Sequence, residues 1–278
     1  MDYILSIVVL AGINMIAVLG LSIFTGFTGL FSLGHAAFVG VGAYTSAILT
    51  YYYYVPFPLA LLSGAAAAGL VSLIIGIPTL RAKLRSDYFA IAILGFGEAL
   101  RVILENLEIT NGARGLPGID SFTTLPIVIF CLGGGILVAR NFLRSREAHS
   151  SEDPIAAEMA GVRLFQTRLL SLVVSAVYCG LSGGLLAHFL SFIQPVMLPD
   201  QSAASRGGHR RRRGCCHLIA SFVFIALPEA LRVAQIWRLV AYGLLLVLIM
   251  VYRPQGLMGY SEISSFFSKN RSRERMQP

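Results

Sequence analysis

The chain has 278 residues, of which 56% are hydrophobic and only 13% charged, with a formal net charge of +8 and a mean hydropathy of +0.73. Soluble domains carry about 25% charged residues, so this composition excludes a water-soluble domain, a disordered chain and a disulfide-rich secreted module. Asp2 is the only Asp, Glu, Lys or Arg in the first eighty residues. We therefore interpret the chain as an integral membrane protein that contacts lipid, with its basic residues on cytoplasmic loops rather than on nucleic acid.

Apolar runs of the length that crosses a bilayer recur along the whole chain. A transmembrane helix needs about 20 mostly apolar residues, and fewer where it is broken or re-entrant. The first run lacks the basic region and small-residue cleavage site of a signal peptide, so we interpret it as a span. With broken or re-entrant segments, the pattern predicts an all-α polytopic bundle of about 8–10 spans. The runs are residues 4–24, 32–50, 58–80, 88–104, 125–139, 169–193, 218–233 and 236–252.

The basic residues predict how the chain is oriented. Short cytoplasmic loops retain Lys and Arg, so the cluster at 81–85 and the loop 140–168 are both expected in the cytoplasm. The N-terminus and the loop 106–124 are then outside. The transmembrane domain is expected at 1–260, followed by a basic cytoplasmic tail at 261–278. Three spans are predicted after the 140–168 loop, and three crossings from the cytoplasm would place the tail outside. The number of crossings between Asp200 and Ile236 is therefore miscounted.

Small and polar residues interrupt the apolar pattern between the first two spans, at Gly26, Thr28, Gly29, Ser32 and Gly34. Such a break either lines a substrate path at membrane depth or is a plain turn between helices. His35 is the only His, Asp, Glu, Lys or Arg within these two spans. Intramembrane ionisable groups are often functional, yet a neutral imidazole can also be a packing residue, and both interpretations stay open.

Other small and charged residues predict contacts within the membrane. Small residues four apart let helix backbones approach closely, as in the pairs Ala36 with Gly40, Gly64 with Ala68, and Gly180 with Gly184. Glu98 and Arg101 lie three apart and can pair on one helix face, which favours a structural ion pair over a substrate contact. Turn residues of the 106–124 loop form either a simple connection or a surface for an external partner: Asn111, Gly112, Arg114 and Gly118.

The loop 140–168 contains a segment with its own helix signals. Asp153 can cap a helix, and Pro154 fits the first helical position. Ile155, Met159 and Val162 then form one apolar stripe. A short amphipathic helix of this kind lies on the lipid surface or docks in a groove of a soluble partner.

Six segments carry a resemblance that covers most of the chain. They read GFTGLFSLGHAAFVGVGAYTSAIL (26–49), LRSDYFAIAILGFGEALR (84–101), TNGARGLPGI (110–119), DPIAAEMAGV (153–162), SAVYCGLSGGLLAHFLSFIQP (175–195) and YGLLLVLIMVYRPQGLMG (242–259). In this order they closely resemble the integral membrane permeases of branched-chain amino acid ABC importers. The segment AAEMAG looks like the EAA-type coupling loop through which such permeases engage their ATPase.

The resemblance assigns roles to two sets of residues. It implies coupling to the ATPase at Asp153, Pro154, Ala156, Ala157, Glu158 and Gly161, where Gly161 permits the sharp turn after the helix. It implies a translocation path along Gly26, Thr28, Gly29, Ser32, Gly34, His35, Gly40 and Gly42.

The resemblance also implies a setting and a set of partners. These are a multi-pass position in the bacterial inner membrane, alternating access, a second and non-identical permease subunit, two cytoplasmic ATPases and an external solute-binding protein. It implies no cofactor and no metal. The sequence has no Gly-rich phosphate loop, no H-E-x-x-H and no nucleophile elbow, so the chain is not expected to be an enzyme and ATP hydrolysis is expected on other polypeptides. Similar permeases import urea or short amides. An ATP-independent carrier is a second alternative, although paired intramembrane acids would be more typical of it.

One stretch departs from the family pattern. Arg206 to His217 reads RGGHRRRRGCCH, where the family carries apolar Gly, Val and Ala. A basic loop and an anionic-lipid patch are two interpretations. The third is a compensated frame shift in the gene. If the arginine codons are of the CGN type, moving the reading frame forward by one base from Arg206 permits the amino-acid sequence VVVIGGAGAVA. That apolar product would add a hairpin or a crossing, which returns the tail to the cytoplasm. Four consecutive arginines at membrane depth are costly, so we favour the frame shift.

Overall fold

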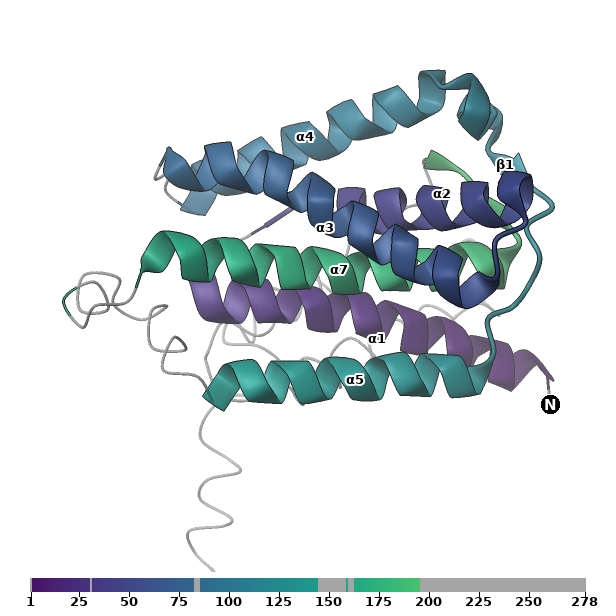
Figure 1. The fold of residues 1–278 in the computed structure, drawn as a ribbon, viewed down its shortest axis with the longest axis horizontal. Coiled ribbons are helices and arrows are strands. Elements are labelled where there is room, and N and C mark those ends of the chain that lie inside the picture. Colours follow the sequence, from purple (N-terminus) through teal and green to yellow (C-terminus); the bar gives the residue numbers. More distant parts are fainter. Residues whose placement is uncertain (1, 31, 83–85, 145–158, 160–162, 196–278) are drawn as a thin grey trace, which may run out of the picture.

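The computed structural model describes residues 2–30, 32–82, 86–144, 159 and 163–195. Long helices account for nearly all of this part of the chain (Figure 1). They are α1 (Asp2–Thr28), α2 (His35–Tyr53), α3 (Phe57–Arg81), α4 (Ser86–Asn106), α5 (Leu125–Arg144) and α7 (Leu164–Leu190). The predicted spans at 218–233 and 236–252, the tail and the basic stretch at 206–217 lie outside the described residues.

Each of these helices coincides with an apolar run, which confirms the all-α membrane bundle. Three helical stretches are long and apolar enough to cross a membrane by length and composition: Leu5–Thr25, Phe57–Arg81 and Leu164–Leu190. Proline and left-handed backbone set several boundaries. α2 is capped by Tyr54, whose φ is +52°, and α3 has Pro58 in its first turn, where a missing N–H costs nothing.

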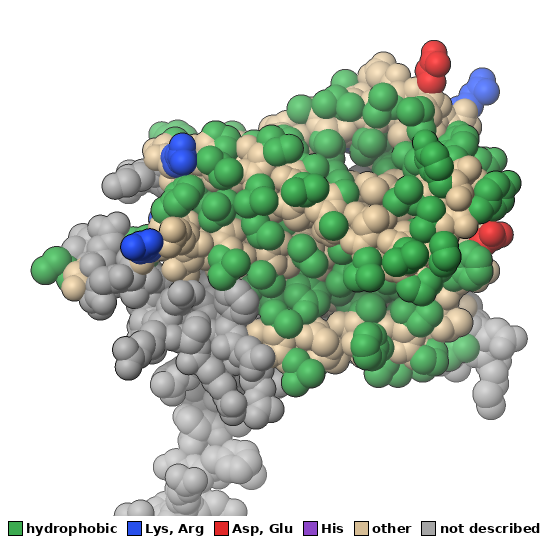
Figure 2. All heavy atoms as spheres, viewed as in Figure 1, with side chains coloured by type: hydrophobic (Ala, Val, Ile, Leu, Met, Phe, Trp, Pro, Cys, Tyr) green, Lys and Arg blue, Asp and Glu red, His purple; other side chains and the backbone are tan. Residues whose placement is uncertain are grey.

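The helices run up and down the bundle (Figure 1). α3 ends and α7 begins at one end, whereas the N-terminus and the connection between α4 and α5 lie at the other. Lys and Arg side chains show at both ends in Figure 2, with acidic side chains only at the second end, and apolar side chains cover the body between them. The end shared by α3 and α7 holds Arg81, in the last turn of α3, and Arg163, the N-cap of α7, as the distribution of cations predicts.

α7 is the central helix and packs against α1, α2 and α3. Glycines bring α2, α3 and α7 together. A Cβ added to Gly180 would lie 2.7 Å from the Cβ of Ala68, and one added to Gly64 would lie 2.6 Å from the carbonyl oxygen of Gly42. A Cβ on Gly42 would overlap the backbone of Gly180. The close packing predicted from Gly64, Ala68 and Gly180 is therefore present.

The connection between α4 and α5 folds over the ends of α2 and α7. It contains the 3₁₀ turns η1 (Glu108–Thr110) and η2 (Gly112–Arg114), and the short strand β1 (Leu116–Pro117). β1 pairs antiparallel with β2 (Phe192–Ile193), with Leu116 opposite Ile193. Thr123 Oγ1 donates a 2.9 Å hydrogen bond to the Leu185 carbonyl oxygen. We call residues 107–124 the outer cap, after the external side on which the basic residues predict this loop, and the strand pair and the Thr123 bond tie it to α7 and β2.

Candidate functional site

The break between α1 and α2 covers residues 29–34, a shorter stretch than the sequence suggests. Gly26 lies within α1, which continues to Thr28. The turn begins at Gly29, whose φ of +64° favours glycine. Thr28 Oγ1 donates to the Phe24 carbonyl oxygen at 2.8 Å and accepts from the Leu30 N–H at 3.1 Å, so this side chain closes the end of α1.

The break lies inside the bundle rather than at its end. Ser32 and His35 are 1% and 3% exposed. His35, the first residue of α2, contacts Ser175 of α7. Ser175 follows the first residue of α7, Leu164, by eleven positions, which is about 16 Å along a helix at 1.5 Å per residue. The break therefore lies well inside the bundle, where the predicted spans would place it at membrane depth, and non-helical backbone is tolerated there when protein surrounds it.

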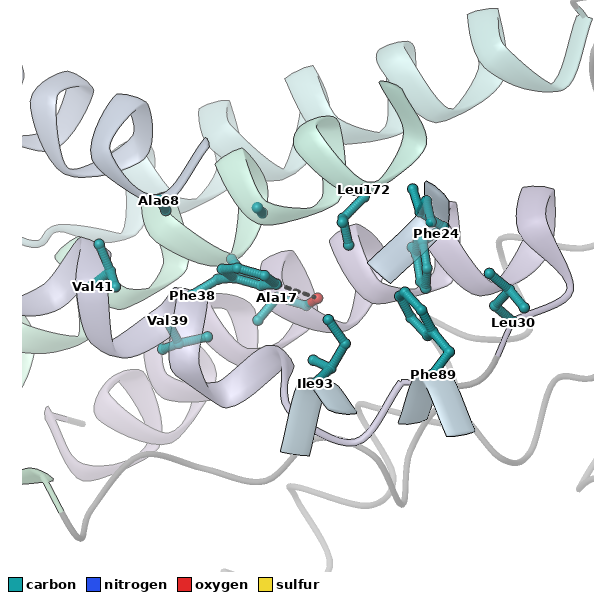
Figure 3. Close-up of a cluster of buried hydrophobic side chains, with 13 residues drawn as sticks. Ala17, Phe24, Leu30, Phe38, Val39, Val41, Ala68, Phe89, Ile93 and Leu172 are labelled. Carbon is teal, nitrogen blue, oxygen red and sulfur yellow. Dashed lines mark hydrogen bonds between the residues drawn. The ribbon is translucent and has the colours of Figure 1, made fainter. Parts of the chain in front are cut away.

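Polar groups and aromatic rings enclose His35. Its Nδ1 atom lies 2.6 Å from Ser32 Oγ and its Nε2 atom 2.8 Å from Ser175 Oγ. The rings of Phe24 and Phe38 each lie 5.4 Å from the imidazole, centroid to centroid. Both ring nitrogens therefore have hydrogen-bond partners. Phe24 and Phe38 belong to the apolar cluster drawn in Figure 3.

Small residues let the neighbouring helices approach the break. A Cβ on Gly34 would overlap the Ile93 carbonyl group of α4, so α4 closes directly on the break. Phe89 of α4 stacks on Phe24 of α1 at 5.5 Å, and Phe24, Phe89 and Ile93 lie together at this point (Figure 3). Gly40 and Gly42 are buried further along α2.

The residues predicted for the path thus occupy one continuous segment. Thr28, Ser32, Gly34, His35, Gly40 and Gly42 are buried in contacts between helices, and Gly29 is exposed. Their role in a path stays a prediction. The residues predicted for coupling, Asp153, Pro154, Ala156, Ala157, Glu158 and Gly161, lie outside the described residues.

A second polar contact joins the other ends of α2 and α7. The Nε2 atom of His188 lies 3.1 Å from Thr50 Oγ1, and its Nδ1 atom lies 2.8 Å from the Gly184 carbonyl oxygen. The rings of Phe57 and Phe122 pack on the imidazole, so His188 is fully buried near the outer cap. His35 and His188 therefore connect the same two helices at two separate levels.

α4 carries an ion-pair chain. Arg101 Nε donates a 3.0 Å hydrogen bond to Glu105 Oε1, and Arg101 Nη1 lies 3.7 Å from Glu98 Oε2. The pair predicted between Glu98 and Arg101 is therefore present. Glu105 is not singled out by the sequence analysis, although its spacing of four from Arg101 is the usual signal for a second pair. Among the described residues, no group of three or more His, Cys, Asp or Glu could hold a metal ion.

These features define a polytopic helical membrane protein with a buried helix break. Residues 3–139 match the family described as the branched-chain amino acid transport system permease component. The chain is 30% identical, over an alignment 301 positions long, to the high-affinity branched-chain amino acid transport system permease protein LivM of Escherichia coli K12; the alignment covers 91% of this chain and 69% of LivM. The LivM protein of Salmonella typhimurium is also 30% identical, over an alignment 295 positions long, with 88% of this chain and 68% of that protein covered. No solved structure matches the chain significantly.

The chain belongs to the family of branched-chain amino acid ABC transporter permeases. It is therefore a transport permease rather than a catalytic enzyme, and a membrane protein that works with partner subunits. The resemblance carried by the six sequence segments is thereby confirmed.

Proposed function

We propose that this chain is the inner-membrane permease subunit of an ATP-driven importer of branched-chain amino acids, and that it moves its substrate by alternating access. The similarity to LivM over 91% of the chain carries this proposal, because the name of that protein states branched-chain amino acid transport. The helical bundle with its internal break supports the same function, since interrupted helices at membrane depth are a recurring element of transporters.

The partners follow from what the chain itself lacks. Its sequence has no phosphate-binding loop, so two cytoplasmic ATPases supply the energy by docking on the loop 140–168. The apolar stripe of the 153–162 segment enters a groove of the ATPase, with Glu158 and Gly161 at the contact. A second, non-identical permease subunit completes the path, and an external solute-binding protein delivers the substrate.

The path itself is proposed along residues 26–42. The break joins α1 to α2, and the buried contact between His35 and Ser175 holds the start of α2 against α7. A non-helical segment held in this way can shift between two packings without unfolding a whole span, which alternating access requires.

The test of the proposed function is uptake by the assembled transporter. We would express the chain with its ATPases, the second permease subunit and the binding protein, and measure uptake of labelled leucine. Glu158→Ala combined with Gly161→Val is expected to abolish uptake while the amount of permease in the membrane stays unchanged. Gln166→Ala is the matched control for a general effect of substitution near this loop, because Gln166 is exposed in the first turn of α7 and lies outside the coupling segment.

Each outcome decides between functions. Normal uptake by the double variant would overturn the coupling assignment. Uptake that persists without the ATPases would show an ATP-independent carrier instead. If the cognate binding protein retains urea or a short amide and not leucine, the substrate is urea or a short amide rather than a branched-chain amino acid.

A further inference from the structure

α4 has one face packed on the bundle and one open face. Phe89, Ile93, Leu100 and Leu104 belong to or pack against the buried clusters that α4 shares with α1 and α2. Tyr88, Ile91, Leu94 and Val102 are large, exposed residues on other sides of the helix. In a membrane, an open apolar face of this kind is ordinarily covered by lipid.

The ion-pair chain lies on the open side of α4, where contact of its charged side chains with lipid would be unfavourable. The side chains of Glu98, Arg101 and Glu105 are 64%, 39% and 27% exposed. Glu98 follows Ser86, the first residue of α4, by twelve positions, which is about 18 Å along the helix axis. In the span predicted at 88–104, this position would lie within the hydrocarbon, about 30 Å thick, where charged groups face a water-filled cavity or a polar partner.

The three charges differ in how firmly each is held. Arg101 is anchored to Glu105 by a 3.0 Å hydrogen bond. A guanidinium has five N–H donors, so this bond leaves others available to a carboxylate. Glu98, at 3.7 Å from Arg101, is beyond hydrogen-bond distance and is the most exposed of the three. The site therefore presents an unsaturated carboxylate beside an unsaturated guanidinium.

A buried hydroxyl lies close behind this site. Tyr44 of α2 is 2% exposed, and its hydroxyl has no hydrogen-bond partner among the described residues. Tyr44 packs in the same cluster as Leu104, the residue before Glu105 in α4. An unpartnered hydroxyl therefore lies in the cluster that α2 shares with this part of α4.

We propose that Glu98 and Arg101 bind the head group of a zwitterionic amino acid on the open face of α4, the side of this helix away from the break near residues 26–42, Glu98 the α-ammonium and Arg101 the α-carboxylate. Glu105 positions Arg101. This inference rests on the proposed function and deepens it, because the paired charges match a zwitterion and have no counterpart in a neutral amide. The open face of α4 then borders water and substrate rather than lipid.

Thiol accessibility tests whether this face borders water. In a cysteine-free chain within the complete transporter, we would compare Glu98→Cys with Leu70→Cys, a 63% exposed position on α3. A charged, membrane-impermeant methanethiosulfonate reagent is expected to modify the thiol of the Glu98→Cys variant at least tenfold faster, because a thiol in lipid does not ionise. Equal, slow rates would show that lipid or a dry protein contact covers α4 and would overturn the inference.

Transport kinetics test the binding role. Glu98→Gln keeps the size of the side chain and is expected to lower leucine uptake at least tenfold, while the binding protein still stimulates ATP hydrolysis. Glu98→Asp is expected to recover part of the uptake. Glu108→Gln, in the exposed η1 turn, is the matched control and should transport normally.

The remaining outcomes separate this inference from the proposed function. Unchanged uptake by Glu98→Gln, or a loss of assembled complex, would make the charges structural and overturn the inference. A reactive thiol at position 98, in a complex whose unsubstituted form takes up no leucine, would instead remove the proposed function. An unreactive thiol at that position, in a complex whose unsubstituted form transports leucine, would overturn the inference alone.

Discussion

The Nε2 atom of His35 lies 2.8 Å from Ser175 Oγ, which joins the first residue of α2 to the middle of α7 across 140 positions of sequence. Because Ser32 Oγ contacts the other ring nitrogen at 2.6 Å, the imidazole also holds the end of the helix break. One side chain thus fixes where α2 begins relative to α7. The geometry of the break depends on this contact.

Ser175→Ala is expected to destabilise the protein by about 1 kcal/mol, the usual value of a buried hydrogen bond between helices. Thermal unfolding of the detergent-solubilised protein measures this loss. Ser63→Ala is the control, because the Ser63 hydroxyl contacts only the Ala60 carbonyl oxygen of its own helix in the bonds identified. Equal effects of the two substitutions would show that the contact with His35 contributes nothing specific.

Gly180→Val is expected to prevent α7 from packing, with a loss of about 3 kcal/mol or more. The added side chain would meet the Gly64 carbonyl oxygen and the Ala65 Cα at 3.1 Å, and backbone atoms cannot move aside as a flexible side chain can. The yield of monodisperse protein after extraction measures the effect. Gly133→Val on α5 is the matched control, since a Cβ there meets nothing within 4 Å among the described residues. Similar yields for the two variants would contradict the packing.

The sequence predicts the helices well and their contacts poorly. The apolar run predicted at 58–80 corresponds to the helix Phe57–Arg81, because a long apolar stretch that begins at a proline has clearly marked ends. The sequence places Gly26 within the break, but this residue lies inside α1, since a single glycine does not end a helix that is supported on both sides. The contact of His35 with Ser175 and the β1–β2 pair join distant segments, and local periodicity carries no information on such pairs.

Gly115→Ala is expected to loosen the outer cap. Gly115 has a φ of +77°, and a Cβ there would overlap the carbonyl oxygen of Ile193 in β2. The strain of about 1–3 kcal/mol should release β1 from β2 and make residues 107–124 more sensitive to protease added from outside. Asp120→Ala, at an exposed position of the same cap, is the control. Unchanged cleavage of the Gly115 variant would mean that the strands do not hold the cap.

The basic stretch at 206–217 yields a prediction at the level of the gene. Resequencing is expected to show CGN codons for Arg206 and Arg210 to Arg213. A frame-restored allele, which encodes an apolar segment there, should be more abundant in the membrane than the chain with four consecutive arginines, because each arginine opposes insertion. AGA or AGG codons in a verified frame would defeat the frame-shift hypothesis. Quantitative blotting of membrane fractions compares the two alleles.

The central position of α7 determines when the bundle can assemble during synthesis. α1, α2 and α3 leave the ribosome long before α7, yet α7 packs against all three, and Gly42 and Gly64 face Gly180 where α2, α3 and α7 meet. Until residue 190 has been synthesised, α1, α2 and α3 lie in the membrane without the helix that packs against all three. Fragments that stop before α7 should therefore insert with only the partial packing of α2 on α3 and of α1 on α5, and a separately expressed α7 is the segment that would complete the bundle.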